Sequence, residues 1–263
     1  MTLSSIRDYC TLACLLLAGC AVAKPPSGKL TVAAAADLQF ALPAMLAQFK
    51  AEHPLVDVSA VYGSSGNFYS QIRNGAPFDL FLSADMDYPR RLAAEGLVVT
   101  DSLFQYAAGR IVVWVPASSP VDVAALGIHA LESDAVKHVA IANPQHAPYG
   151  RAAEAAMRSL GVYDRVKPKL VLGENIAQTL EFVESGAADA GIVALSLALA
   201  PSVRARGRYS EIPLDAYPRV EQGGAVLSRA RGSAAAASLR AFLQEASARR
   251  ILRDYGFYMP EGR

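Results

Sequence analysis

The segment that decides the fold reads LTVAAAADLQFALPAMLAQF and runs from Leu30 to Phe49. Its first part, Leu30 to Ala34, is an apolar run of the length of a buried strand. Beyond Asp37, apolar residues recur at the spacing of a helix as far as Phe49. Pro43 has no backbone N–H, so we expect this helix to begin later than Asp37 or to bend. The segment therefore predicts a buried strand that leads directly into a helix.

The same order of strand and helix recurs along the rest of the chain. Helices of about ten residues between such strands predict parallel sheets covered on both faces, which is the α/β class. The length of 263 residues suits one large domain or two of about 120 residues each. The further strands that we expect are 56–62, 79–83, 111–115, 139–142, 169–172, 191–193 and 225–227.

The cysteines are confined to the start of the chain, where Cys10, Cys14 and Cys20 lie within one apolar run. No thiol follows them in the sequence. A disulfide framework, a thiolate metal site, an iron–sulfur cluster and a cysteine nucleophile are therefore excluded from the rest of the chain.

This apolar run is typical of a secretory leader, because its length of about eleven residues falls short of the ~20 that span a bilayer. Two processing sites compete. An Ala-x-Ala site at Ala21–Ala23 would remove residues 1–23, whereas a lipoprotein box at Leu17–Cys20 would remove residues 1–19 and leave Cys20 acylated. A third interpretation is that Cys20 is simply another small apolar residue of the leader. Either site predicts a periplasmic protein, outside the cytoplasmic membrane.

The charged residues nearly balance, since 25 Lys and Arg against 24 Asp and Glu give a net charge of +1. They form no basic block, which argues against a nucleic-acid partner, because phosphates call for a basic face. The four histidines, at positions 53, 129, 138 and 146, are scattered, and no two of them lie at helical or strand spacing. The sequence therefore predicts no metal-ion site.

A small motif, Gly63-Ser64-Ser65-Gly66, follows one of the expected strands. It is not a nucleophile elbow, which needs a glycine on both sides of one serine at two-residue spacing. It is not a P-loop either, because no Gly-Lys-Ser/Thr follows. A secreted serine hydrolase stays open as an alternative of another class, with His146 the only histidine in a suggestive loop. That enzyme would need a base beside Ser64 or Ser65, and no Asp/His arrangement in the sequence suggests one.

Four loops of small residues lead from an expected strand into the start of an expected helix. A helix N-terminus presents unpaired N–H groups and the positive end of a dipole, which favour an anion. In parallel α/β sheets such loops lie at the carboxyl ends of the strands, where ligands bind. Together they would form a pocket of neutral donors for a small oxyanion; the alternative is that their polar residues only cap the helices. The loops are Ala35–Asp37, Ser64–Gly66, Ala147–Gly150 and Gly173–Ile176.

Five longer motifs, three of which contain one of these loops, occur in the order Ala33–Leu38, Gly63–Ile72, Gly75–Asp85, Asn143–Gly150 and Gly186–Val193. Together they resemble the periplasmic molybdate-binding proteins of ABC-type uptake systems, the ModA family. The resemblance covers Lys29 to Phe257, and the stretch from Gly-Ala-Pro to Ser-Ala-Asp is specific to this group.

The resemblance implies a type 2 periplasmic-binding-protein fold, in which two α/β lobes enclose a ligand cleft and are joined by a hinge of two strands. We place the crossings near 106–110 and 208–212. The first lobe would then span 24–107 plus 213–263, and the second lobe 108–212.

The resemblance also implies a function. The protein would capture molybdate or tungstate and deliver it to an ABC permease, as a monomer without a cofactor or catalytic activity. The alternative within the same class is a binding protein for another small oxyanion or acid, since these lobes are reused across ligands.

The ligand-binding residues follow from the same resemblance, position by position. The family's first hydroxyl-donor position falls on Asp37, with Ala36 beside it. The second, a serine at the start of a helix, falls on Ser65. The third and fourth are the backbone N–H groups of Tyr149 and Ile176.

Two departures from the family's pattern affect this site. Many members have a tyrosine after the Gly-Ile-Val strand, where this chain has Ala194, so we expect the phenol of Tyr149 to supply that donor from another wall. The second departure is Asp37, because a carboxylate about 4 Å from a dianion is repelled by several kcal/mol. We expect its side chain to cap the following helix while its backbone N–H serves the ligand. A protonated carboxyl that donates to the anion is the alternative.

Overall fold

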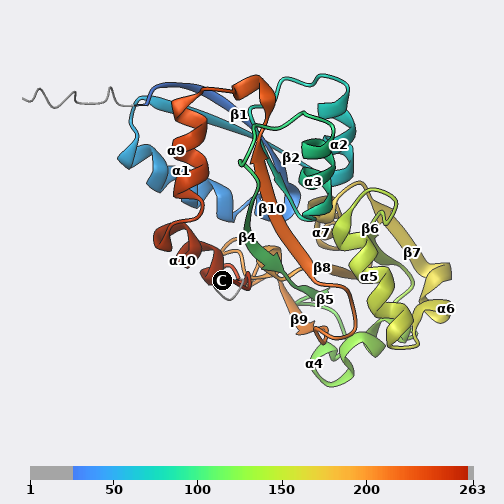
Figure 1. Ribbon diagram of the computed structural model, residues 1–263. Coiled ribbons are helices and arrows are strands. Elements are labelled where there is room, and N and C mark those ends of the chain that lie inside the picture. The colour runs from blue at the N-terminus through green and yellow to red at the C-terminus, as the bar shows by residue number, and fades with distance from the viewer. Residues whose placement is uncertain (1–25, 260–263) are drawn as a thin grey trace, which may run out of the picture.

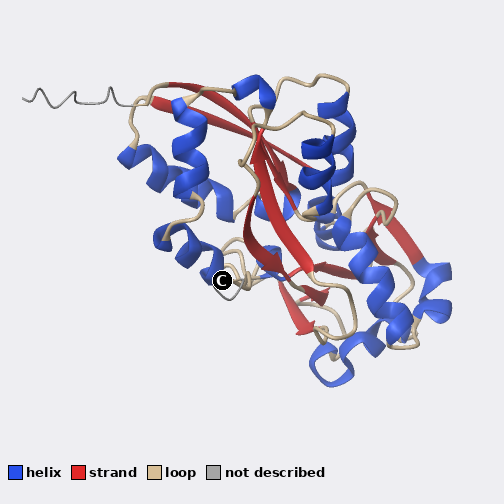
Figure 2. Cartoon of the chain, viewed as in Figure 1, coloured by secondary structure: helices blue, strands red, loops and turns tan. Residues whose placement is uncertain are grey.

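The computed structural model describes residues 26–259, which form two five-stranded sheets, each flanked by helices (Figure 1, Figure 2). We call the sheet that contains the first strand, together with its helices, the first lobe, and the other sheet with its helices the second lobe. The leader, both processing sites and Cys20 lie outside the described residues. Among residues 26–259, no helix combines the length and the apolar character that a membrane span requires.

The first lobe has the strand order β2-β1-β3-β10-β4. β1 pairs in parallel with β2 and β3, whereas β10 runs antiparallel to β3 and β4. The strands are β1 (Gly28–Ala35), β2 (Val56–Gly63), β3 (Leu80–Ser83), β4 (Phe104–Gly109) and β10 (Val220–Val226). The helices are α1 (Ala41–Glu52), α2 (Ser65–Arg73), α3 (Asp87–Ala94), α9 (Ala234–Phe242) and α10 (Ala246–Asp254), with short 3-10 turns η1 (Ala36–Leu38) and η4 (Ser228–Ala230).

The second lobe has the strand order β7-β6-β8-β5-β9. β6 pairs in parallel with β7 and β8, whereas β5 runs antiparallel to β8 and β9. The strands are β5 (Ile111–Pro116), β6 (Val139–Ala142), β7 (Leu170–Gly173), β8 (Ala190–Ala194) and β9 (Gly207–Glu211). The helices are α4 (Val123–Leu126), α5 (Pro148–Ser159), α6 (Tyr163–Val166), α7 (Ile176–Glu184) and α8 (Leu195–Ala198), with η2 (Gly127–Glu132) and η3 (Lys167–Lys169).

The expectation of purely parallel sheets is wrong, because each sheet contains antiparallel pairs. The reason is the path of the chain between the lobes. A single residue, Arg110, joins β4 in one sheet to β5 in the other, and the chain returns from β9 to β10. β5 and β10 therefore enter their sheets from the side where the parallel strands end, and they run in the opposite direction. The sequence indicated β4 and β9 only as crossings, whereas both pair fully within a sheet.

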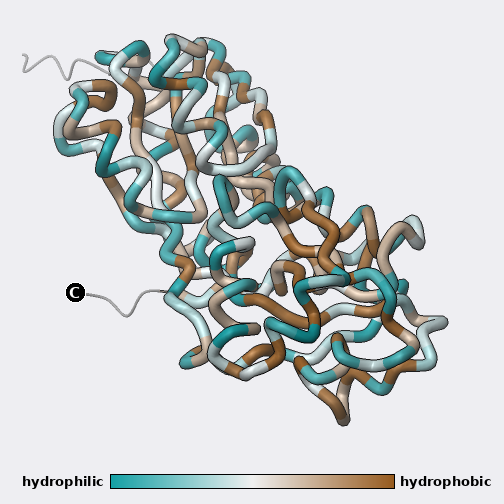
Figure 3. Tube along the Cα trace, turned by 90° about the vertical axis from the view of Figure 1, so that its right-hand side faces the viewer, coloured by the Kyte–Doolittle hydropathy of each residue, from teal (hydrophilic) through white to brown (hydrophobic). Residues whose placement is uncertain are grey.

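Apolar side chains fill the interior of both lobes, and Figure 3 shows hydrophobic stretches of the chain running through each. Trp114 of β5 is 1% exposed in the second lobe. Phe49 of α1 and Phe242 of α9 pack in the first lobe with ring centroids 5.4 Å apart. The expected displacement of the first helix is confirmed: α1 begins at Ala41, which puts Pro43 in the first turn, where its missing N–H breaks no helical hydrogen bond.

Candidate functional site

A small cavity lies where the two lobes meet, at the carboxyl ends of β1, β2, β6 and β7, and its space of about 200 Å³ is partly open to solvent. Each of the four loops singled out in the sequence contributes to its wall. The five residues that the resemblance assigned to the ligand all line it. The lining residues are Ala35, Ala36, Asp37, Gly63, Ser64, Ser65, Ala84, Ala147, Pro148, Tyr149, Asn175 and Ile176.

Three of these wall segments are the N-termini of helices. Ser65 begins α2, Ile176 begins α7, and Tyr149 is the second residue of α5. Residues in the first turn have no acceptor within their own helix for the backbone N–H. The three N–H groups, with the positive ends of three helix dipoles, make this part of the wall suitable for an anion without any basic side chain.

Helix capping accounts for two of the polar side chains in these loops. Ser64 caps α2 by accepting a hydrogen bond from the N–H of Asn67, and Asn175 caps α7 by accepting from the N–H groups of Ala177 and Gln178. For these two side chains the capping alternative is therefore confirmed. Ser65 is different, because its Oγ accepts from the N–H of Ala84 at 2.9 Å, which fixes the start of α2 against the end of β3.

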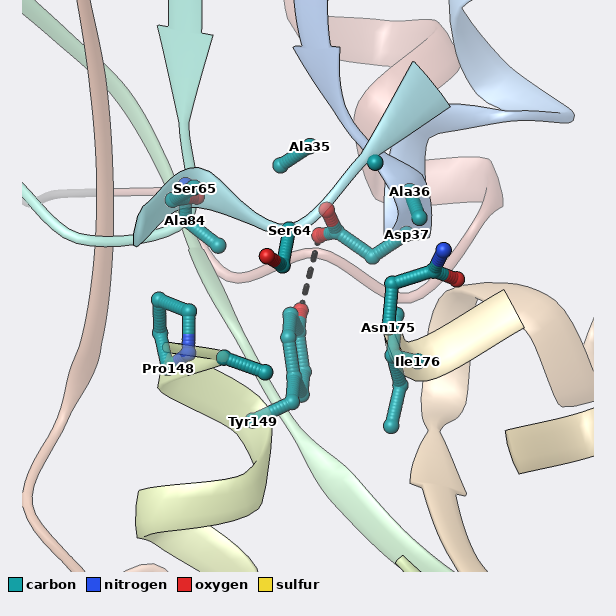
Figure 4. A pocket seen from close by; sticks show the side chains of 12 residues that line it. Ala35, Ala36, Asp37, Ser64, Ser65, Ala84, Pro148, Tyr149, Asn175 and Ile176 are labelled. Carbon is teal, nitrogen blue, oxygen red and sulfur yellow. Dashed lines mark hydrogen bonds between the residues drawn. The ribbon is translucent and has the colours of Figure 1, made fainter. Parts of the chain in front are cut away.

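Another part of the cavity wall carries a buried carboxyl group. Asp37 lies in the η1 turn and is 1% exposed. Its Oδ2 accepts hydrogen bonds from the Tyr149 hydroxyl, at 2.8 Å, and from Nε2 of Gln222. Nε2 of Gln222 also donates to the Tyr149 hydroxyl at 2.9 Å, and its Oε1 accepts from the Tyr106 hydroxyl at 2.9 Å. Figure 4 shows the Asp37 carboxyl and the Tyr149 ring joined across the cavity.

Burial controls the acidity of this carboxyl group. It raises the pKa of Asp37 from 3.8 to about 6, although the hydrogen bonds from Gln222 and Tyr149 partly oppose the shift. Burial and the neighbouring Asp37 charge raise the pKa of Tyr149 well above its ordinary value, so the phenol stays neutral and donates. Asp37 Oδ1 is also buried, and it has no hydrogen-bond partner within the described part of the chain.

The expectation that Asp37 caps the following helix is wrong. The N-cap of η1 is Ala35, and the turn has no side-chain cap. Asp37 is inside the turn, so its carboxyl group points toward the other lobe instead of back to the first N–H groups. Tyr149 was expected to offer its phenol to the ligand, but its hydroxyl hydrogen is already donated to Asp37.

Several polar contacts close the rim of the cavity between the lobes. Ser64 Oγ lies 3.0 Å from Nδ1 of His146, and the N–H of Gly66 donates to the His146 carbonyl at 2.9 Å. Nδ2 of Asn67 donates to the Glu174 carboxylate. The lobes are therefore in contact above the cavity as well as at Asp37, which is the closed arrangement of a two-lobed protein.

The structure does bring a base beside Ser64, which the sequence did not suggest. His146 contacts Ser64 through Nδ1, while its Nε2 lies 3.7 Å from the carboxylate of Glu174. That distance is too long for the hydrogen bond that orients the base in a hydrolase, and the Glu174 side chain is 58% exposed. The geometry therefore joins two lobes more readily than it activates a nucleophile.

Sequence reasoning missed Gln222 and the pairing of Ser64 with His146. Gln222 is a fully buried polar residue within β10, where it follows the polar Glu221, so no local pattern marks it. Its partner Asp37 is 185 positions away in the sequence, so no local pattern connects the two.

Comparisons with known proteins place this cavity in context. A family model described as bacterial extracellular solute-binding protein matches residues 30–258. The molybdate-binding protein ModA of Rhodobacter capsulatus is 40% identical over 200 residues, which are 76% of this chain and 77% of that protein. ModA of Azotobacter vinelandii is 35% identical over 242 residues, 91% of this chain and 94% of that protein.

A solved structure gives the same picture in three dimensions. The periplasmic molybdate-binding protein of Azotobacter vinelandii superposes with a TM-score of 0.79 at 30% sequence identity. The match covers 88% of this chain and 100% of that chain. The two-lobed fold described above is therefore that of an extracytoplasmic binding protein.

Proposed function

The chain belongs to the bacterial extracellular solute-binding protein family, and we propose that it captures molybdate in the periplasm for uptake by an ABC transporter. Tungstate, which differs little from molybdate in size, is the second ligand of the proposal. The permease that receives the ligand is the proposed partner. The proposed ligand-binding residues are Ala36, Asp37, Ser65, Tyr149 and Ile176.

The observation that carries this proposal is the convergence of three helix N-termini on a cavity without a basic side chain in its wall. A tetrahedral dianion has four oxygens that only accept hydrogen bonds, and neutral N–H donors match it. A protonated oxyanion such as hydrogen phosphate would turn its own O–H toward these donors, which disfavours it. Sulfate is smaller, so donors held rigidly by helices would lie too far from its oxygens.

The contacts between the lobes explain how binding is linked to closure. Ser65 belongs to the first lobe, whereas Tyr149 and Ile176 belong to the second. A ligand held by all three N–H groups bridges the lobes, so it binds the closed arrangement more tightly than the open one. In the proposal, the permease recognises this closed arrangement.

We also propose how the leader is processed and where the two lobes begin and end. Residues 1–23 would be removed as a signal peptide, or residues 1–19 if Cys20 becomes a lipid anchor. The first lobe would comprise 24–107 plus 213–263, and the second lobe 108–212, in a monomer.

A thermal-shift panel tests the proposal with molybdate, tungstate, sulfate, phosphate and citrate. A ligand present at 100 times its dissociation constant adds ~2.7 kcal/mol to the free energy of unfolding. We expect molybdate and tungstate to raise the melting temperature and the other three anions to leave it unchanged. A rise with citrate or sulfate alone would support the alternative ligand class, and no rise with any anion would refute the proposal.

A further inference from the structure

The cavity contains one polar atom that the closed protein leaves unused. Asp37 Oδ1 is buried without a hydrogen-bond partner in residues 26–259, while Oδ2 of the same carboxyl group accepts two hydrogen bonds. A buried polar atom without a partner is unfavourable, so its presence on a residue that lines this cavity points to a partner that arrives with the ligand.

The groups around Asp37 provide no positive charge. Tyr149 faces it from α5, Gln222 from β10 and Tyr106, through Gln222, from β4. Ser196 of α8 donates to the Asp37 backbone carbonyl at 2.9 Å. Within the described part of the chain, no Lys, Arg or His forms a hydrogen bond or ion pair with this carboxyl group. An ionised Asp37 beside a dianion would place three negative charges in a buried site with no cation.

A single proton removes this conflict. Oδ2 is already occupied as an acceptor by Tyr149 and Gln222, so the proton belongs on Oδ1. An Oδ1–H group is a neutral donor, like the N–H groups of Ser65, Tyr149 and Ile176. The cavity then presents only donors to a ligand that only accepts.

This inference rests on the function proposed above. We propose that Asp37 takes up one proton from solvent when the oxyanion binds and donates it, from Oδ1, in a hydrogen bond to an oxyanion oxygen. No bond of the ligand forms or breaks, and the proton stays on the carboxyl group until the ligand leaves. Asp37 is thus a residue that determines specificity, because it makes capture of a dianion dependent on pH.

The acidity of the carboxyl group sets the pH range of the effect. With a pKa of about 6 in the closed protein without a ligand, Asp37 is mostly ionised at pH 7.5 and mostly protonated at pH 5. The two negative charges of the bound ligand raise the pKa of Asp37 further. Above pH 7, the dissociation constant should therefore increase about tenfold for each pH unit, because each binding event must take one proton from solution.

Calorimetry measures the proton directly. Molybdate is titrated into the full-length mature protein at pH 7.5 in buffers of low and high ionisation enthalpy, and the slope of the heat against that enthalpy counts the protons. We expect about one proton at pH 7.5 and about a quarter of a proton at pH 5.5, where most Asp37 is already protonated. A slope of zero at pH 7.5 with normal binding refutes the inference and leaves the proposed function intact. No heat and no thermal shift with molybdate or tungstate in any buffer refutes the proposed function itself.

The variant Asp37→Asn identifies the donor. Its amide oxygen can accept from Tyr149 and Gln222, and its NH2 group takes the place of Oδ1–H. We expect it to bind molybdate within a few-fold of the wild type at pH 7.5, with no proton uptake and a dissociation constant that is flat from pH 6 to 9. Asp87→Asn is the matched control, because this carboxylate is 75% exposed on α3, and it should still take up about one proton.

The alternative is that the proton sits on the ligand and an ionised Asp37 accepts it. In that case the wild type would still take up a proton, but Asp37→Asn, which presents a donor at Oδ1, would lose affinity for molybdate by tenfold or more. The wild type would also bind hydrogen phosphate. Either result overturns the donor role of Asp37. If Asp37→Asn fails to fold, the proton count and the phosphate titration of the wild type still decide between the two.

Discussion

Two parts of the cavity wall differ in how they meet a ligand. The first, which we call the backbone wall, consists of the N-termini of α2, α5 and α7, whose donors are backbone N–H groups. The second, the carboxyl wall, is the η1 turn, whose Asp37 carboxyl group is held by Tyr149 and Gln222. The first wall follows from the fold, because every parallel strand that ends at this edge leads into a helix. The second wall depends on three side chains, so we expect it to set the properties that are particular to this protein.

The largest expected effect is the pH dependence of stability that Asp37, in the carboxyl wall, causes in the protein without ligand. The pKa of Asp37 is about 6 in the folded protein, against 3.8 for an aspartate that is fully exposed to water, so the folded protein binds this proton more tightly than the unfolded chain. Its contribution to stability is present below pH 4 and is lost as the pH rises through 6. Over this pH range the contribution of Asp37 to the free energy of unfolding changes by up to about 3 kcal/mol, since one pKa unit corresponds to about 1.36 kcal/mol.

Asp37→Asn removes this titration. Urea denaturation from pH 4 to 8 should show the variant gaining stability relative to the wild type, from near zero at pH 4 to as much as about 3 kcal/mol at pH 8. The exposed control Asp87→Asn should not show that trend. A difference between Asp37→Asn and the wild type that stays constant over the whole range would contradict a raised pKa in the closed protein.

The backbone wall is tested by removing one N–H. Ile176 is the first residue of α7, where proline is tolerated, and Asn175 before it is extended, as a residue before proline prefers. Ile176→Pro therefore deletes a donor while keeping the helix. A hydrogen bond to a charged group contributes about 1.5–3 kcal/mol, so we expect molybdate affinity to fall by about tenfold to a hundredfold.

Ile176→Ala is the matched control for this substitution. It also shortens the buried side chain, but it keeps the backbone N–H. Titration calorimetry of both variants should show a much larger loss for proline than for alanine. Equal losses would mean that the apolar contact of Ile176, and not its N–H, supports the ligand.

The same division explains what the sequence could predict. Asp37, Ser65, Tyr149 and Ile176 each follow a strand by two to seven residues, so local patterns bring each of them to the carboxyl edge of its own sheet, and the structure puts all four in one cavity. The side chains around Asp37 are different. Gln222 reaches it from β10, an antiparallel strand that arrives from the other lobe, and hydropathy along the chain contains no information on that direction.

The departures at Tyr149 and Asp37 were visible in the sequence, but their connection was not. In the sequence each is a separate substitution that faces the ligand or a helix end. The hydrogen bond between them spans 112 positions and joins the lobes, so it forms only when the two sheets and their helices come together. The phenol donates to Oδ2 of the carboxyl group, which is why neither side chain behaves as its own loop would predict.

A smaller effect is expected from Tyr149→Phe, which weakens the carboxyl wall without removing it. Asp37 Oδ2 loses the hydroxyl donor and keeps Gln222, so the unfolding free energy should fall by about 1–2 kcal/mol. In the wild type the hydrogen bond from Tyr149 lowers the pKa of Asp37, so its loss should raise that pKa. A larger share of Asp37 is then protonated before binding, and proton uptake at pH 7 should decrease. Molybdate affinity should fall a few-fold.

Tyr209→Phe provides the control for that variant, because this tyrosine is 36% exposed on β9, away from the cavity. Urea denaturation and calorimetry should find it indistinguishable from the wild type. An unchanged dissociation constant and proton count for Tyr149→Phe would separate Tyr149 from the recognition of the ligand and limit its side chain to a packing role.

The smallest effect is expected at the rim, where Ser64 and His146 join the walls from outside. His146→Ala removes the contact of Nδ1 with Ser64 Oγ, whereas His146→Asn puts an amide nitrogen near the same place. An exposed or half-buried hydrogen bond contributes about 0.5–1.5 kcal/mol, so we expect release of molybdate to be about twofold to tenfold faster in the alanine variant and restored in the asparagine variant. Stopped-flow dilution of the molybdate complex, followed by the fluorescence of Trp114, would measure the rates. Faster release in both variants would show that packing of the imidazole ring, and not its hydrogen bond to Ser64, holds the lobes together at the rim.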